Sequence, residues 1–216
     1  MQAFDSKLLK KDVFGQIFVL ERGPQSSILR DSTQAARWAR FTARWLLMRE
    51  ARALVALEDL SGVPVLLELS RDKLERSYIG GKPMQQARPT DPAYFVAAMS
   101  LLRQLHRRGV VHNDLAKEPN LLVTRNGAPA FIDFQLASVS YRRGKLFRIL
   151  AREDIRHLLK HKRTYCADHL SSREKTILST PATISRLWMA TGKRVYMFVT
   201  RRLLGWKDRE GAGDRV

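Results

Sequence analysis

The stretch VVHNDLAKEPNLLV, residues 110–123, decides how the rest of the chain is interpreted. Within it, Asp114 and Asn120 are set among apolar residues. A carboxylate or an amide that is buried without a partner costs free energy. Such residues are therefore expected at strand ends or in tight loops. The next apolar segment, PAFIDFQL at 129–136, contains a third residue of this kind, Asp133.

Composition limits the class of protein. The chain has 216 residues, enough for one sizeable domain or two small lobes packed together. Its hydrophobic fraction, 44%, is typical of a globular protein. The formal charge of +18 predicts an anionic partner, either nucleic acid, a phosphorylated substrate or an anionic membrane surface. A basic surface that is merely solvated is the alternative.

The sequence also bears on location. A single cysteine, Cys166, cannot form an internal disulfide, which favours a reducing compartment. The first residues lack the apolar segment of a secretion signal. A run of about 18 apolar residues, the length that spans a bilayer, is also missing. We expect a cytoplasmic protein, either soluble or peripheral at the inner face of the membrane.

Residue patterns predict strands first and then a long helix. Residues 12–31 read as strands around a turn at Arg22-Gly23-Pro24. Residues 32–57 read as a helix, with Ser32 or Asp31 as its N-cap. An apolar stripe at steps of three and four is expected to face the core. It consists of Trp38, Phe41, Trp45 and Met48. Two more strands follow, in VPVLLEL and LERSYI.

A Gly- and Pro-rich segment at 79–92 is the best boundary in the sequence. It suggests an N-lobe at 1–82 and a C-lobe at 83–216. A helix is expected at 93–108, then a hairpin with a two-residue turn at Asn126-Gly127, and helices from Arg152 onward. The expected fold is α+β, with a small β-rich N-lobe, a mainly helical C-lobe and a cleft between them.

The hairpin should place Asn120 near Asp133. Two oxygen ligands on neighbouring loops suit Mg²⁺, which takes one or two protein ligands together with phosphate oxygens. Asp114 is in the same loop as Asn120 and is placed to accept a hydroxyl proton. A metal clamp and a positioned nucleophile are the requirements of phosphoryl transfer.

The sequence His112-Asn113-Asp114 followed by Asn120, and then Ile132-Asp133-Phe134, resembles the catalytic loop and metal motif of the protein kinase-like superfamily. Asn120 and Asp133 stand thirteen positions apart, as is usual in that superfamily. The chain is most similar to its small bacterial members, namely RIO-like kinases and the lipopolysaccharide kinases that phosphorylate heptose or Kdo. The resemblance covers about residues 10–165 and implies a two-lobed kinase-like fold.

The resemblance also implies roles for single residues. Asp114 would be the catalytic base, Asn120 and Asp133 would hold Mg²⁺, and His112 would brace the loop. Lys117 would reach the γ-phosphate of ATP.

The same resemblance assigns the ATP-phosphate position. In the strand before the first helix, Arg30 stands where the superfamily has a lysine, and Glu50 would be its partner. A surface pairing of Glu50 with Arg49 or Arg52 is the alternative.

Besides Arg30, the chain departs from the superfamily pattern in three ways. Asn120 follows Asp114 by six positions instead of five, so the role of Lys117 is not fixed. Gln135 replaces the glycine that often ends the metal motif. There is no GxGxxG, and the segment DVFGQIF at 12–18 offers the single glycine Gly15. Asp154 has two readings, as an acceptor for the catalytic-loop backbone or as an acid that favours a helix N-terminus.

The function expected from these residues is that of an ATP- and Mg²⁺-dependent kinase. It would transfer the γ-phosphoryl group to a hydroxyl of an anionic acceptor, either protein Ser/Thr or a lipopolysaccharide-type sugar. The basic YRRGK at 141–145 lies where kinases bind substrate. The C-terminal residues Phe198, Leu203, Leu204 and Trp206 would contact a membrane or pack on the core. The alternative function is a catalytically idle kinase-like scaffold that binds RNA or ribosomal particles.

Overall fold

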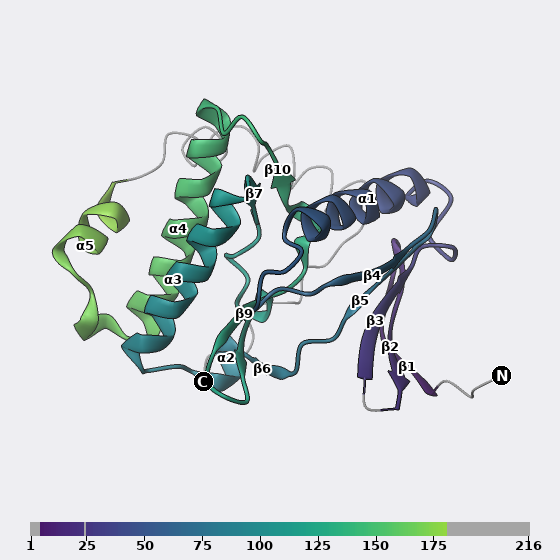
Figure 1. The fold of residues 1–216 in the computed structure, drawn as a ribbon, viewed down its shortest axis with the longest axis horizontal. Coiled ribbons are helices and arrows are strands. Elements are labelled where there is room, and N and C mark those ends of the chain that lie inside the picture. Colours follow the sequence, from purple (N-terminus) through teal and green to yellow (C-terminus); the bar gives the residue numbers. More distant parts are fainter. Residues whose placement is uncertain (1–4, 24, 181–216) are drawn as a thin grey trace. The chain divides into compact units, whose positions relative to one another are not determined.

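The structure is a computed structural model that describes residues 5–23 and 25–180 (Figure 1). The chain forms two compact units, Met1–Lys175 and Thr176–Val216. The described strands and the candidate site all lie in the first unit. This division does not coincide with the predicted lobes 1–82 and 83–216, and those lobes stay a prediction.

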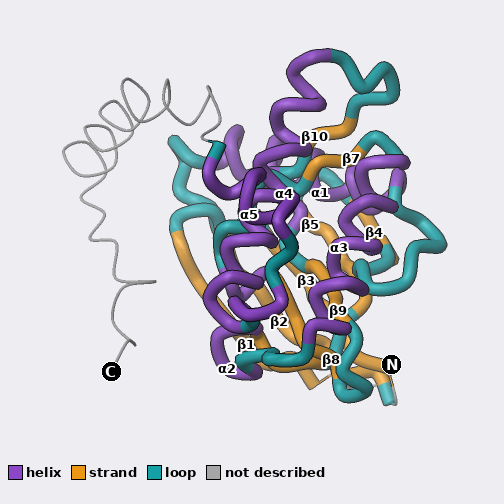
Figure 2. Tube along the Cα trace, turned by 90° about the vertical axis from the view of Figure 1, so that its left-hand side faces the viewer, coloured by secondary structure: helices purple, strands orange, loops and turns teal. Residues whose placement is uncertain are grey.

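An antiparallel sheet forms the N-terminal part, with the strand order β1-β2-β3-β5-β4. Its strands are β1 Asp5–Asp12, β2 Gly15–Arg22, β3 Gln25–Asp31, β4 Leu66–Leu69 and β5 Lys73–Ser77. Figure 2 shows β1, β2 and β3 running alongside one another. The strands predicted on either side of residues 22–24 are confirmed, whereas β1 was not predicted. Its sequence, DSKLLKKD, is rich in lysine, which is common on exposed edge strands.

Helix α1, Arg40–Ala56, starts eight residues later than predicted. Its N-cap is Ala39, and the hydroxyl of Ser32 instead donates to the carbonyl oxygen of Asp72. The predicted inward stripe is wrong, because its four residues are exposed: Trp38 61%, Phe41 82%, Trp45 47% and Met48 41%. The buried residues of α1 are Ala43, Leu47, Glu50, Ala51, Ala53 and Leu54. Both stripes have helical spacing, so spacing alone could not identify the inward face.

The C-terminal part combines short strands with helices. The elements are β6 Gly81–Pro83, α2 Met84–Ala87, α3 Pro92–Arg107, β7 Val110–Val111, β8 Leu121–Thr124, β9 Pro129–Phe131, β10 Ser138–Val139, α4 Lys145–Tyr165 and α5 Ser172–Ser179. Strands β6, β8 and β9 form one sheet, and β7 pairs with β10. Helices α3 and α4 lie side by side (Figure 1).

Helix α3 has the expected limits to within one residue. The Asp91 carboxylate accepts a hydrogen bond from the backbone N–H of Ala93, and Pro92 is the first helical residue. After the helix, Gly109 has φ +77°, and a Cβ there would lie 2.8 Å from the Ser140 carbonyl oxygen. The chain therefore needs glycine at this position to turn into β7.

Two predicted boundaries in the C-terminal part are wrong. The β8–β9 connection has three residues, Arg125–Asn126–Gly127, because Thr124 and Ala128 still share a backbone hydrogen bond of 2.9 Å. Gly127 takes the positive φ that such a loop requires. Helix α4 begins at Lys145 and not near Arg152, so Asp154 lies well inside the helix.

The main hydrophobic core fixes both ends of the opening stretch. Leu102 and Leu105 of α3 are fully buried and pack with Val110 on one side and Leu121 on the other. The apolar residues around the loop thus anchor strands β7 and β8, while the polar residues between them are left to form a site. None of the described helices is long and apolar enough to cross a membrane.

Candidate active site

Asp154 of α4 holds the loop between β7 and β8 through two hydrogen bonds from the loop backbone. One carboxylate oxygen accepts the backbone N–H of His112 at 2.7 Å, and the other accepts that of Asn113 at 2.9 Å. The Asp154 residue is 1% exposed, so water does not replace these bonds. Of the two readings of Asp154, the structure supports the loop acceptor, because the residue is far from the N-terminus of α4.

His112 connects this loop to the segment that contains Asp133. Its Nε2 lies 3.0 Å from the Ile132 carbonyl oxygen, and its ring packs against Phe134 at 4.6 Å between centroids. The backbone N–H of Asp114 points to Nδ1 of the same ring at 3.3 Å. Nδ1 thus accepts while Nε2 donates, which fixes the neutral tautomer with its proton on Nε2. The histidine is fully buried and braces the two segments.

Two donors hold the Asp114 side chain. Its Oδ2 accepts a hydrogen bond of 2.9 Å from Nδ2 of Asn120 and lies 3.0 Å from Nζ of Lys117. Nδ2 of Asn120 also donates to the carbonyl oxygen of Asp114. The extra loop residue is accommodated by a 3-10 turn at Glu118–Asn120, where the hydroxyl of Tyr165 donates to Glu118 at 2.6 Å. The longer loop therefore still brings Lys117 to Asp114.

The β8–β9 ladder brings Asn120 and Asp133 to the same end of the sheet. Leu121 pairs with Phe131, and one step further the backbone N–H of Ile132 donates to the carbonyl oxygen of Asn120 at 3.0 Å. Asp133 has φ +65°, a conformation uncommon for a non-glycine residue and frequent at functional sites. The hairpin thus brings the backbones of Asn120 and Asp133 together, as expected, and the role of Asp133 as a metal ligand stays a prediction.

The candidate metal site contains only oxygen donors. Nδ2 of Asn120 is bound to Asp114, so its Oδ1 is the atom that can meet a cation. The Asp133 side chain is one-third exposed. A carboxylate and an amide oxygen, completed by phosphate oxygens, suit Mg²⁺. Within residues 5–23 and 25–180, no three or more His, Cys, Asp or Glu side chains are grouped to hold a metal ion.

A buried ion cluster links β3, α1 and β5. Glu50 is fully buried, and its carboxylate lies 3.4 Å from Nε of Arg30 and 3.0 Å from Nε of Arg76. Arg30 also reaches Asp133, at 3.5 Å. The alternative surface pairing of Glu50 is wrong, because Glu50 is fully buried and Arg49 donates instead to the carbonyl oxygens of Leu136 and Ala137, in the segment 132–137 that contains the metal motif.

Sequence reasoning missed Arg76. A signal was present, since Leu74 and Arg76 alternate along β5 and Leu74 is fully buried on the side of α1. An arginine two positions from a core leucine on a strand is expected to point the same way. In the structure, Arg76 does point to this side and shares the Glu50 carboxylate with Arg30.

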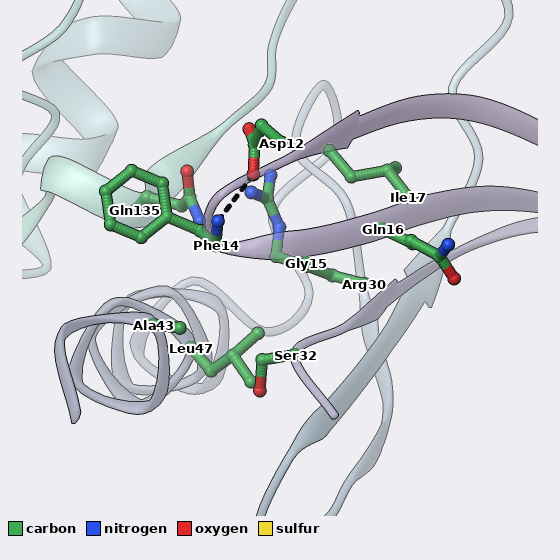
Figure 3. Close-up of a pocket in the computed structure, with 10 residues that line it drawn as sticks. All are labelled: Asp12, Phe14, Gly15, Gln16, Ile17, Arg30, Ser32, Ala43, Leu47 and Gln135. Atoms are coloured by element: carbon green, nitrogen blue, oxygen red, sulfur yellow. Dashed lines mark hydrogen bonds between the residues drawn. The ribbon is translucent and has the colours of Figure 1, made fainter. Parts of the chain in front are cut away.

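The turn between β1 and β2 lies close to Arg30, although it lacks GxGxxG. Gly15 has φ +130°, and a Cβ there would overlap the carbonyl oxygen of Asp31. The turn thus packs directly on the end of β3. Figure 3 shows the small pocket that results, with Phe14 of the turn, Arg30 of β3 and Gln135 of the metal-motif segment among its lining residues.

Comparison with known proteins supports the fold. No model of a protein family matches the sequence, and no curated protein sequence matches it. Among solved structures, the chain is similar to the Rio2 kinase-ADP/Mg²⁺-phosphoaspartate complex from Chaetomium thermophilum. The identity is 15%, the match covers 94% of this chain and 71% of the other, and the TM-score is 0.60.

A second structure of Rio2 kinase from the same organism gives a similar result, with 16% identity, coverage of 96% and 74%, and a TM-score of 0.61. The chain therefore has an α+β, protein kinase-like fold like that of the RIO-like kinases. The C-terminal stripe that includes Trp206 lies outside the described residues.

Proposed function

We propose that this chain is an ATP- and Mg²⁺-dependent phosphotransferase that transfers the γ-phosphoryl group to a hydroxyl. The observation that carries the proposal is the arrangement of Asp114, Asn120 and Asp133. The three side chains lie on two segments that His112 and the β8–β9 ladder join. The likeness to the Rio2 kinase-ADP/Mg²⁺-phosphoaspartate complex supports the same assignment.

Each residue has a distinct task in this proposal. Asp114 accepts the proton of the attacking hydroxyl, and its hydrogen bond to Asn120 keeps its side chain in one orientation. Asn120 and Asp133 hold Mg²⁺, which neutralises charge on the phosphate oxygens. Lys117 lies beside Asp114 at the solvent side and contacts the γ-phosphate.

Arg30 binds the other ATP phosphates, and Glu50 fixes its position. Arginine presents a planar fork of donors that matches phosphate geometry, unlike the point charge of lysine. Arg76 shares Glu50 and keeps that carboxylate paired while Arg30 engages a phosphate. The buried cluster therefore replaces the usual lysine–glutamate pair with one glutamate and two arginines.

The acceptor in this proposal is a hydroxyl of a protein Ser/Thr or of a lipopolysaccharide-type sugar, in the cytoplasm or at the inner face of the membrane. The second candidate, an idle scaffold that binds RNA, is favoured by the arginine at position 30 and by the missing GxGxxG. The intact set of Asp114, Asn120 and Asp133 favours the enzyme.

The test uses labelled ATP with Mg²⁺ and a cell lysate that is then fractionated into protein, lipopolysaccharide and nucleic acid. We expect the wild-type chain to transfer label to one fraction and both Asp114→Asn and Asp133→Asn to abolish the transfer. Asp168→Asn, which changes an exposed aspartate, is the charge-matched control and should leave transfer unchanged. A wild-type chain that neither binds nor turns over ATP, yet binds RNA equally well after Asp133→Asn, would establish the scaffold instead.

A further inference from the structure

A basic hollow lies where the end of α3 meets the start of α4. Arg103, His106 and Arg107 stand on one face of α3, because their spacing is three and four residues. Arg143 precedes α4, and Phe147 and Arg148 belong to its first turns. The Phe147 ring is nearly buried and meets His106 edge-on at 6.2 Å, so it forms an apolar floor.

The four arginines of this hollow have no acidic partner among the described residues. In the described part of the chain, no carboxylate forms an ion pair with Arg103, Arg107, Arg143 or Arg148. By contrast, Arg22 pairs with Glu75 and Arg44 with Asp72. Four guanidinium groups around one hollow repel one another unless an anion lies between them. Guanidinium forks bind phosphate oxygens in pairs.

The N-terminus of α4 adds to the positive potential of the hollow. This helix is 21 residues long, its N-cap is Gly144, and its first turn contains no acidic residue. The first backbone N–H groups therefore have neither a capping side chain nor a carboxylate in the first turn, and the helix dipole favours an anion at this end. Arg143 and Arg148 stand on either side of this terminus.

The hollow is connected to the catalytic loop by one side chain. Nε2 of His106 lies 3.4 Å from Oδ2 of Asp154, the oxygen that accepts the backbone N–H of His112. A ligand beside His106 is thus two contacts away from the loop that presents Asp114.

We propose that this hollow is a binding site for a phosphate group, separate from the site of the transferred phosphoryl group. Its ligand is a phosphomonoester or pyrophosphate, because a group with about two negative charges satisfies several guanidinium forks at once. The charge comes from α3, α4 and the residue before the α4 N-cap, and the nearly buried ring of Phe147 sets the depth of the site. The assignment does not depend on whether the chain is a kinase.

The experiment compares pyrophosphate binding by calorimetry in three proteins at one ionic strength. They are the wild type, Arg103→Gln/Arg148→Gln, and Arg52→Gln/Arg125→Gln, a control that removes the same charge from exposed sites elsewhere. We expect the hollow variant to bind at least about tenfold more weakly, which corresponds to 1.4 kcal/mol. The control should stay within about twofold of the wild type. Equal affinity in all three proteins would overturn the proposal, as would equal weakening of both variants.

Further arms identify the source of the phosphate. Glucose 6-phosphate represents a soluble phosphomonoester, and vesicles containing phosphatidic acid represent a lipid headgroup. Binding of either one that Arg103→Gln/Arg148→Gln weakens supports the site and names its source. If pyrophosphate, glucose 6-phosphate and the vesicles all bind the hollow variant as tightly as the control variant, the proposal is refuted. The arginines changed in the two variants, namely Arg103, Arg148, Arg52 and Arg125, are all exposed. Without ligand, both variants should therefore unfold at the wild-type temperature.

Discussion

Replacing Asp154 with alanine should destabilise the folded chain by about 3–6 kcal/mol, since each hydrogen bond to a charged group contributes about 1.5–3 kcal/mol. The estimate rests on two bonds, those from the backbone N–H groups of His112 and Asn113, at 2.7 and 2.9 Å. The carboxylate is 1% exposed, so its removal leaves two backbone donors that water cannot reach without opening the loop. Asp154→Asn keeps one acceptor oxygen and should cost about half as much.

Urea unfolding of the wild type and the variants measures this free energy directly. Arg152→Ala is the matched control, because it changes an exposed residue of the same helix two positions away and should fall within about 0.5 kcal/mol of the wild type. Amide hydrogen exchange at His112 and Asn113 should accelerate in Asp154→Ala before global unfolding. If Asp154→Ala is as stable as Arg152→Ala, the carboxylate does not hold the catalytic loop and the reasoning fails.

Three further perturbations test the site and its surroundings. Glu50→Gln removes the carboxylate that Arg30 and Arg76 share, so the buried Arg76 loses its acidic partner and Arg30 keeps only Asp133; the change should cost about 3–5 kcal/mol in urea unfolding, and a loss below 1 kcal/mol would contradict the buried cluster. Gly15→Ala should lower the unfolding temperature more than Gly144→Ala, because its Cβ would overlap the end of β3 whereas a Cβ on Gly144 meets open space. Burial lowers the pKa of His157 below its usual 6.5, so the unfolded chain binds this proton first and stability should fall as the pH drops below 6.5. His157→Gln should flatten that fall between about pH 7.5 and 5.5, and an unchanged profile would assign it to other groups.

The candidate site was predictable from the sequence because its geometry is local. Asn120 and Asp133 are joined by a single hairpin, and a hairpin between two apolar strands brings its ends together whatever surrounds it. Asp114 and His112 follow from the same loop. The order of strands and helices was also predictable, since it depends on periodicity within short segments.

Long-range packing explains what the sequence did not reveal. The inward face of α1 depends on which of its two stripes packs against the sheet. The stripe that does so contains Glu50, which pairs there with two arginines from different strands. The helix expected from Arg152 begins at Lys145, because Phe147 and Ala151 pack against Val111. Such contacts join segments far apart in sequence, and no local pattern encodes them.

Arg49 gives the exposed Trp45 of α1 a contact. Its guanidinium lies over the ring of Trp45 at 4.5 Å and donates to the carbonyl oxygens of Leu136 and Ala137, just after the metal motif. Burial lowers the pKa of Arg49, which is the cost of placing this cation against the backbone. The neighbouring residue, Glu50, reaches Arg30 and through it Asp133. Two consecutive residues of one helix are thus linked to the segment 133–137, Arg49 directly through Leu136 and Ala137 and Glu50 indirectly through Arg30, so a shift of α1 would disturb both links together.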